Sequence, residues 1–217
     1  MSRARQAKQR VRTARGRPTA STRWLERQLN DPYVHRARDE GYRARSAYKL
    51  LEIDAKHQIL KPGRKVCDLG AAPGSWAQVC ARKGLQVIGL DLERVEPLAG
   101  CTFLEGDFRE TAVRTRLRAV LDGRADVVLS DMAAAATGQR LVDRLRAEEL
   151  AEAVLAFGDD VLATDGDVLV KLVKGAEPAA RAAALPRFRS VQFVRPPATR
   201  KDSSEMFLLG RGHRPRD

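Results

Sequence analysis

The hydrophobic pattern after Gly63 alternates between short apolar runs and longer segments whose apolar residues recur at helical spacing. The short runs predict seven strands, at Val66 to Leu69, Gln86 to Leu90, Thr102 to Leu104, Asp126 to Ser130, Asp167 to Val173, Val191 to Val194 and Met206 to Leu209. Helices are predicted between them at about 75–83, 109–121, 142–163 and 177–185. This alternation is typical of an α/β fold with a mostly parallel sheet, helices on both faces, and a ligand site at the carboxyl ends of the strands.

The last two predicted strands differ from the others because only a short segment, residues 195–205, separates them. Such a connection has no room for a crossover helix. We therefore expect these two strands to pair antiparallel, which gives an otherwise parallel sheet an antiparallel last strand.

A helical region is predicted ahead of the sheet, from Trp24 to Leu60. Its apolar residues form one stripe at helical spacing, made of Ala44, Ala47, Tyr48, Leu51 and Ala55. A second face is polar and open to a ligand or to water, with Arg45, Lys49, Glu52 and Lys56.

The length of 217 residues suits one domain. We expect a basic, disordered arm at 1–22, a domain at 23–212 whose first part, 23–62, is helical, and a short tail at 213–217. No apolar run approaches the length of a bilayer span, which argues against an integral membrane protein. No secretory signal pattern is present either, and we expect a cytoplasmic protein.

The charge of the chain indicates what kind of partner the protein binds. The chain has 40 Lys and Arg against 28 Asp and Glu, a formal net charge of +12. Eight of the basic residues lie within residues 1–23, which contain no acid. This excess predicts a polyanionic partner, with nucleic acid favoured over an anionic membrane surface.

The cysteines and histidines do not indicate a metal site or a disulfide framework. Cys67, Cys80 and Cys101 have no paired spacing and are expected to be buried, reduced thiols. The three histidines fall in separate segments without carboxylate or cysteine neighbours at ligand spacing, so no metal is expected.

A glycine-rich turn and three acidic residues suggest a cofactor. Residues 67–76 read Cys-Asp-Leu-Gly-Ala-Ala-Pro-Gly-Ser-Trp between a predicted strand and a predicted helix, where Gly70 and Gly74 permit a tight turn and Asp68 is expected to face the ligand. Asp91 ends the next strand, where a carboxylate can accept hydrogen bonds from ribose hydroxyls, and Asp107 is expected to end the third. The glycines alone are also compatible with an ordinary strand-to-helix turn.

The glycine spacing distinguishes between adenosine-bearing cofactors. A dinucleotide requires glycines at G-x-G-x-x-G spacing to hold its pyrophosphate, and this chain has D-L-G-A-A-P-G instead. S-adenosylmethionine has no phosphate and carries a sulfonium cation, which suits a pocket rich in carboxylates. The pattern therefore favours S-adenosylmethionine, and a nicotinamide oxidoreductase is disfavoured.

One charged residue ends an apolar strand, and another interrupts the next one. Asp131 follows the fourth predicted strand, and Lys171 lies inside the fifth, in Val-Leu-Val-Lys-Leu-Val. A lysine in a buried parallel strand is costly unless it is paired or emerges at the ligand edge. The alternative is a strand-end lysine whose ammonium reaches water.

These features together resemble the FtsJ-like family of RNA 2′-O-methyltransferases. The resemblance covers nearly all of residues 22–212 and includes Asp-Pro-Tyr-Val at 31–34, Arg-Ala-Arg-Ser-Ala-Tyr-Lys-Leu at 43–50, Asp-Leu-Gly-Ala-Ala-Pro-Gly at 68–74, Glu-Gly-Asp-Phe at 105–108, Ser-Asp-Met-Ala at 130–133 and Ser-Ser-Glu at 203–205. It implies a Rossmann-like class I S-adenosylmethionine-dependent methyltransferase with a catalytic tetrad at Lys49, Asp131, Lys171 and Glu205. It also implies that Trp76 packs near the cofactor, although a role in the helix core is the alternative.

The resemblance is strongest to bacterial members that act on large-subunit ribosomal RNA. It implies methylation of a ribose 2′-hydroxyl of a uridine in 23S ribosomal RNA of the assembled large subunit, with Lys171 as general base or as a stabiliser of the developing alkoxide. We expect the protein to be a monomer. Methylation of transfer RNA or another RNA, and a non-catalytic RNA-binding assembly role, remain alternatives. Seven basic residues are expected to bracket the site and contact phosphates, namely Arg36, Arg38, Arg43, Arg45, Arg195, Arg200 and Lys201.

One departure from the family pattern lies beside the expected tetrad. The family usually continues Ser-Asp-Met-Ala with Pro-Asn, whereas Ala134 and Ala135 follow here. The change removes a rigid turn and a side-chain amide, so substrate placement or rate is expected to differ.

Overall fold

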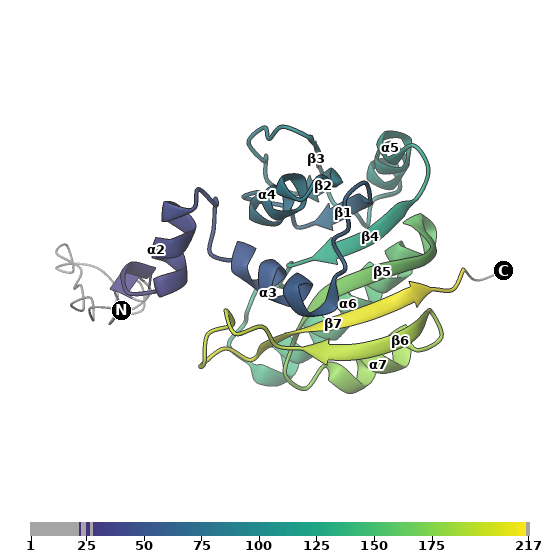
Figure 1. Ribbon diagram of the computed structural model, residues 1–217. Helices are drawn as coiled ribbons and strands as arrows, with labels where there is room; N and C mark the ends of the chain where they lie inside the picture. The colour runs from purple at the N-terminus through teal and green to yellow at the C-terminus, as the bar shows by residue number, and fades with distance from the viewer. Residues whose placement is uncertain (1–21, 23–24, 27, 216–217) are drawn as a thin grey trace.

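The computed structural model describes residues 22, 25–26 and 28–215, and the expected basic arm lies almost entirely outside these residues. A seven-stranded sheet forms the centre of the molecule, in the order β3-β2-β1-β4-β5-β7-β6 (Figure 1). Its strands are β1 (Lys65–Leu69), β2 (Gln86–Asp91), β3 (Cys101–Glu105), β4 (Ala125–Ser130), β5 (Leu162–Val173), β6 (Phe188–Val194) and β7 (Glu205–His213). All seven predicted strands are thus confirmed, although β5 begins five residues earlier than predicted.

Strand directions follow the prediction. Each neighbouring pair from β3 through β2, β1 and β4 to β5 is parallel. The strand that is last in the chain, β7, lies between β5 and β6 and is antiparallel to both. The first residue of β7 therefore lies at the same edge of the sheet as the carboxyl ends of the parallel strands.

Helices cover both faces of the sheet. They are α2 (Pro32–Asp39), α3 (Ala47–His57), α4 (Ser75–Arg82), α5 (Thr111–Leu121), α6 (Arg140–Val161) and α7 (Glu177–Ala184). Because strand side chains alternate between faces, each face has its own buried core. Val128 of β4 packs with residues of α5, α6 and α7, whereas its neighbours Val127 and Leu129 pack with residues of α3 and α4.

The predicted helical region ahead of the sheet is divided in two. α2 ends at Asp39, and α3 begins at Ala47 after a segment that turns at Gly41, whose φ is +70°. The predicted apolar stripe was wrong in part: Ala47 and Tyr48 are buried, but Ala44 precedes α3 and Ala55 is exposed. Leu50 and Ile53 provide the buried face of α3 instead, because they face the core that α3 shares with α4.

Two other expectations concern the C-terminal end of the domain and the cysteine thiols. β7 continues to the fully buried His213, one residue past the expected end of the domain at 212. Cys67 and Cys80 are buried, Cys101 is half-buried, and all three are free thiols. None of the described helices is long and apolar enough to span a membrane.

Candidate active site

Four charged side chains from distant parts of the chain meet at one edge of the sheet. The ammonium of Lys49 lies 2.6 Å from Oε1 of Glu205 and 3.5 Å from Oδ1 of Asp131. The ammonium of Lys171 lies 3.1 Å from the same Oδ1 of Asp131. The side chains are between 10% and 20% exposed, so the cluster is partly shielded but reachable from solvent. The structure thus brings together the four residues at which the resemblance implies a tetrad.

The register of the sheet explains this convergence. Ser130, the last residue of β4, is paired with Val170 of β5, so Asp131 and Lys171 follow as neighbours on adjacent strands. Glu205 opens β7 opposite Val173, a short distance further along β5. Lys49 reaches the same point from the first turn of α3.

Lys171 is held by Asp131 in two ways. Besides the ion pair with Oδ1, its ammonium donates a hydrogen bond to the backbone carbonyl of Asp131. Oδ1 of Asp131 is in turn shared between Lys171 and Lys49. Two ammonium groups and two carboxylates therefore compensate each other's charge within the cluster, as buried charges require.

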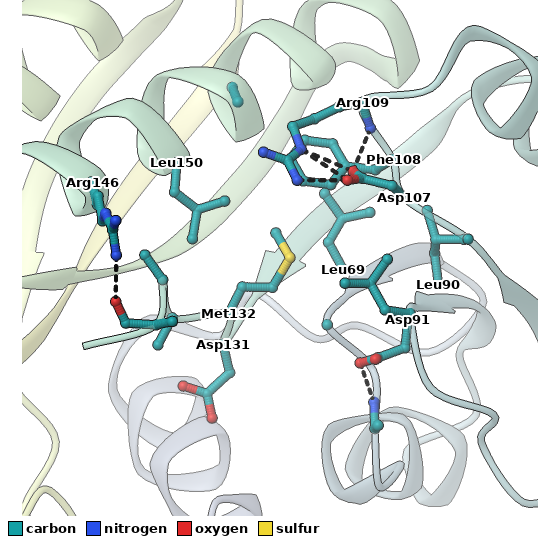
Figure 2. Close-up of a pocket in the computed structure, with 18 of the residues that line it drawn as sticks. Leu69, Leu90, Asp91, Asp107, Phe108, Arg109, Asp131, Met132, Arg146 and Leu150 are labelled. Carbon is teal, nitrogen blue, oxygen red and sulfur yellow. Dashed lines mark hydrogen bonds and ion pairs between the residues drawn. The ribbon is translucent and has the colours of Figure 1, made fainter. Parts of the chain in front are cut away.

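A cleft of about 660 Å³ adjoins the cluster at the carboxyl ends of β1, β2 and β4. Of the predicted cofactor residues, Gly70, Asp91, Asp107 and Asp131 line it, while Asp68, Gly74 and Trp76 do not. Its walls combine these acids with apolar side chains from several elements, including Leu69, Leu90, Phe108, Met132 and Leu150 (Figure 2). Ala134 and Ala135 also line it, so the missing Pro-Asn of the family pattern concerns a wall of the cleft.

Asp91 both shapes the cleft and faces it. Its Oδ2 accepts a hydrogen bond from the backbone N–H of Ala72 at 2.8 Å, and its Oδ1 accepts one from the backbone N–H of Glu93 at 2.9 Å. These bonds fix the glycine-rich turn against the end of β2. Each carboxylate oxygen keeps a further lone pair, so Asp91 can still accept hydrogen bonds from a ligand.

Position 70 requires a glycine both for its backbone conformation and for the packing around it. Its φ is +74°, in the region that side chains disfavour, and a Cβ there would lie 2.3 Å from Cγ of Met132. The side chain of Met132 thus occupies the space next to Gly70, and it is one of the side chains that line the cleft (Figure 2). Any other residue at position 70 would displace Met132 from the wall of the cleft.

Asp107 was expected to end β3, but β3 ends at Glu105, so Asp107 lies in the segment that follows the strand. Its carboxylate is clamped by the guanidinium of Arg109, with Nη2 2.5 Å from Oδ2. This hydrogen bond lowers the pKa of Asp107, and the side chain stays anionic at the rim of the cleft.

Asp68 lies behind the cleft rather than in its wall. It is 1% exposed, and its Oδ2 has no hydrogen-bond partner among the described residues. Burial, followed by the negative charges of Asp131 and Asp91, raises the pKa of Asp68 to about 7. The group is therefore poised to change its charge near neutrality, or to be neutralised by a nearby cation.

Trp76 anchors α4 to the start of α3. Its indole N–H donates a 2.9 Å hydrogen bond to the carbonyl of Ser46, and its ring packs against Phe207 with centroids 5.8 Å apart. The side chain is 3% exposed and does not line the cleft. These contacts fit the alternative role in the helix core, and the position beside the cofactor that the resemblance implies stays a prediction.

Gly74 makes room for Arg43. A Cβ at Gly74 would lie 2.5 Å from Nη1 of Arg43, whose guanidinium donates to the carbonyls of Pro73, Glu96 and Pro97 at 2.8 to 3.0 Å. Arg43 thereby joins the glycine-rich turn to the segment after β2. Sequence reasoning missed this role because backbone carbonyls leave no residue signature.

Most of the expected phosphate-binding arginines also have partners within the protein. Arg36 pairs with Glu40 and lies over the ring of Tyr48. Arg195 donates to the carbonyls of Arg200, Ser203 and Glu205. Arg36 and Arg195 are exposed in spite of these contacts, as are Arg38 and Lys201. Within the described ranges no group of His, Cys, Asp and Glu side chains could hold a metal ion.

Comparisons with known proteins identify a family and several named relatives. A family model described as FtsJ-like methyltransferase matches residues 42–213. The ribosomal RNA large subunit methyltransferase E of Gluconobacter oxydans is 47% identical over 94% of this chain and 77% of that protein. The protein of the same name from Cereibacter sphaeroides is 48% identical over 98% of this chain and 92% of its own length. Among solved structures, a ribosomal RNA methyltransferase from Plasmodium falciparum superposes with a TM-score of 0.73 at 27% identity, covering 81% of this chain and 100% of that one.

Proposed function

Because the chain belongs to the FtsJ-like methyltransferase family, we propose that it methylates the ribose 2′-hydroxyl of a uridine in 23S ribosomal RNA, with S-adenosylmethionine as methyl donor. The substrate is the assembled large ribosomal subunit, and the protein acts as a monomer in the cytoplasm. The names of its relatives support ribosomal RNA of the large subunit as the substrate.

One observation carries the proposal: Asp131 belongs to the cleft and to the charged cluster at once. A methyl donor in the cleft and a hydroxyl beside the lysines would then meet across a single side chain. Methyl transfer to oxygen requires such proximity, since the two reactants must be brought into contact and aligned.

The residues of the cleft fit S-adenosylmethionine. When bound, this cofactor supplies an electrophilic methyl group on a sulfonium cation. Asp91 would accept hydrogen bonds from its ribose hydroxyls, and Gly70 lines the cleft in the turn next to it. The buried Asp68, with an unpartnered oxygen, supports a cationic ligand, because a positive charge nearby would stabilise its ionised form.

The charged cluster would act on the accepting hydroxyl. Lys171 is fixed by its two contacts with Asp131, and it either takes the hydroxyl proton or stabilises the alkoxide that develops. Lys49 and Glu205, 2.6 Å apart, would orient the ribose from the other side. Nucleophile positioning and proton handling thus both depend on this chain's own residues.

The decisive experiment maps ribose methylation in ribosomal RNA from cells with and without the protein. We expect one 2′-O-methylated uridine of 23S RNA to disappear, and purified protein to restore it on large subunits isolated from the deficient cells. Free transfer RNA and free 23S RNA serve as comparison substrates. Methylation of transfer RNA alone would contradict the proposal, and binding of subunits without methyl transfer would identify an assembly factor instead.

A further inference from the structure

A second, smaller pocket of about 270 Å³ opens beside the charged cluster. It is lined by Arg45, Lys49, Arg200, Asp202, Ser203 and Glu205. Lys49 and Glu205 belong to the cluster as well, so the pocket adjoins the proposed position of the accepting ribose. Among the described residues, none that lines the cofactor cleft also lines this pocket.

One buried carboxylate holds the two arginines of this pocket. Oδ2 of Asp31 lies 2.9 Å from Nε of Arg45 and accepts hydrogen bonds from Nε and Nη2 of Arg200 at 3.1 and 3.0 Å. Asp31 is 8% exposed, whereas Arg45 is 16% and Arg200 is 28% exposed. The carboxylate therefore lies behind the guanidinium groups, and they are nearer to solvent.

The surroundings keep these groups in place. Oδ1 of Asp31 caps α2 by accepting from the backbone N–H of Tyr33 at 3.0 Å. Arg45 donates to the carbonyl of Ala198 at 2.6 Å, and Glu52 accepts from the N–H of the same residue at 2.6 Å. The loop that carries Arg200 is thus tied to α3 through Glu52 and to the segment before α3 through Arg45, which preorganises the pocket.

The arginines retain hydrogen-bonding capacity. Two guanidinium groups share one carboxylate oxygen, and among the described residues neither Nη1 of Arg45 nor Nη1 of Arg200 has a hydrogen-bond partner. Glu205 is already engaged by Lys49. Two fixed guanidinium groups with free donors are suited to a phosphate, which accepts charge-assisted hydrogen bonds from arginine.

We propose that this pocket binds a backbone phosphate of the RNA strand beside the target ribose, and that Asp31 is the positioning residue that holds Arg45 and Arg200 for it. The inference rests on the proposed function, because it places the phosphate next to a ribose at Lys49 and Glu205. A phosphate fixed at this point limits how far that ribose can shift along the strand.

Binding to large subunits from cells lacking the protein tests the pocket. The dissociation constant is measured against salt concentration in the presence of S-adenosylhomocysteine. We expect Arg45→Gln and Arg200→Gln each to weaken binding about tenfold and to lower the slope of log K against log salt by roughly 0.7 to 1, the contribution of one phosphate contact. The affinity for S-adenosylmethionine should remain unchanged.

The matched control is Arg189→Gln, which removes the same charge. Arg189 lies near the start of β6, at the end of the strand that is far from the pocket. Its side chain is 59% exposed and pairs with Asp165. It should change the subunit affinity less than twofold. If the wild-type protein methylates subunits but both pocket variants behave like this control, the pocket assignment is wrong and the proposed function stands. If the wild-type protein neither binds nor methylates subunits, both are wrong.

Asp31→Asn tests the positioning role separately. Asparagine also caps helices, so α2 keeps its N-terminal hydrogen bond. We expect weaker subunit binding with an unchanged salt slope, since both guanidinium groups are still present but less well placed. Tighter binding would show that Asp31 only neutralises charge, which would overturn its assignment as a positioning residue. Arg200→Lys should restore the salt slope that Arg200→Gln loses but not the full affinity, because the compact ammonium of lysine lacks the planar fork with which a guanidinium can face Asp31 and the phosphate together.

Discussion

Lys171 contacts Asp131 through both the side chain and the backbone of that residue, with its ammonium 3.1 Å from Oδ1 and hydrogen-bonded to the carbonyl oxygen. The amine is therefore fixed relative to the end of β4 and not only to a rotatable carboxylate. Since Asp131 also lines the cleft, the orientation of Lys171 is tied to the place where the methyl donor is proposed to bind.

Replacement of Lys171 by alanine should abolish methyl transfer while cofactor binding survives. We expect at least a roughly 100-fold loss of turnover, typical of a lost acid–base group, with tritiated donor and large subunits as substrates. The affinity for S-adenosylmethionine, measured by calorimetry, should stay within twofold. Lys174→Ala, an exposed lysine just past the end of β5, is the control. Retained turnover in Lys171→Ala would remove this residue from the mechanism.

Lys49 and Glu205 should act as a unit, because their charged atoms are 2.6 Å apart. We expect Lys49→Met and Glu205→Gln each to reduce kcat strongly, and the double variant to be little worse than the more severe single variant. The measurement is a double-mutant cycle on kcat under saturating donor. Losses that multiply would show that the two residues act independently.

Asp68→Asn should stabilise the ligand-free protein above neutral pH. The pKa of Asp68 is raised from 3.8 to about 7 in the folded state, so its ionisation costs folding free energy that grows as pH rises between these values. The variant should match the wild type near pH 4 and exceed it by a few kcal/mol above pH 7, on the order of 1.4 kcal/mol per pKa unit. Urea unfolding at several pH values checks this. A stability difference that does not change with pH would contradict the raised pKa.

Trp76→Phe should reduce stability without a comparable effect on cofactor affinity. The variant keeps an aromatic ring against Phe207 but leaves the carbonyl of Ser46 without its donor, at a cost of about 1 to 2 kcal/mol. Urea unfolding measures the loss, and calorimetry measures S-adenosylmethionine binding, which should change less than twofold. A tenfold loss of cofactor affinity would instead support the position beside the cofactor that the family resemblance implies.

Removal of residues 2–22 should weaken binding to ribosomal particles and flatten its salt dependence. The deletion takes away Arg3, Arg5, Lys8, Arg10, Arg12, Arg15 and Arg17, and the salt slope falls by a little under one for every phosphate that these side chains no longer neutralise. A variant with glutamine at these positions keeps the length and separates charge from chain length. An unchanged slope in both variants would show that the arm does not contact RNA.

The sequence predicted the sheet well because its strands are bounded apolar runs, and it predicted the antiparallel β7 because the preceding connection is too short for a crossover. The charged cluster followed from the family motifs, and the placement of Asp131 and Lys171 followed from the strand pattern. The N-terminal helices were less predictable, since alanines at helical spacing did not reveal that α2 and α3 are separate or which face is buried.

Most of the other differences between the sequence-based expectations and the structure arise from contacts between residues that are distant in sequence. Arg200 lies 169 positions from Asp31, and Arg43 binds carbonyls that any residue could supply. Neither arrangement has a characteristic spacing in the sequence. The sequence therefore shows only that these arginines are charged, which predicts contacts with phosphates. Asp68 has the position expected of a ligand-facing acid, and only the packing around β1 shows that its carboxyl group is buried behind the cleft.

The insertion of β7 between β5 and β6 affects when during synthesis this protein can become active. A nascent chain that has emerged only through β6 lacks Glu205, so Lys49 has no glutamate to pair with, and β5 still has an open edge. Its final strand must enter between two strands that are already made before the four charged groups can meet. The four charged groups can therefore come together only after β7 has been synthesised and has joined the sheet.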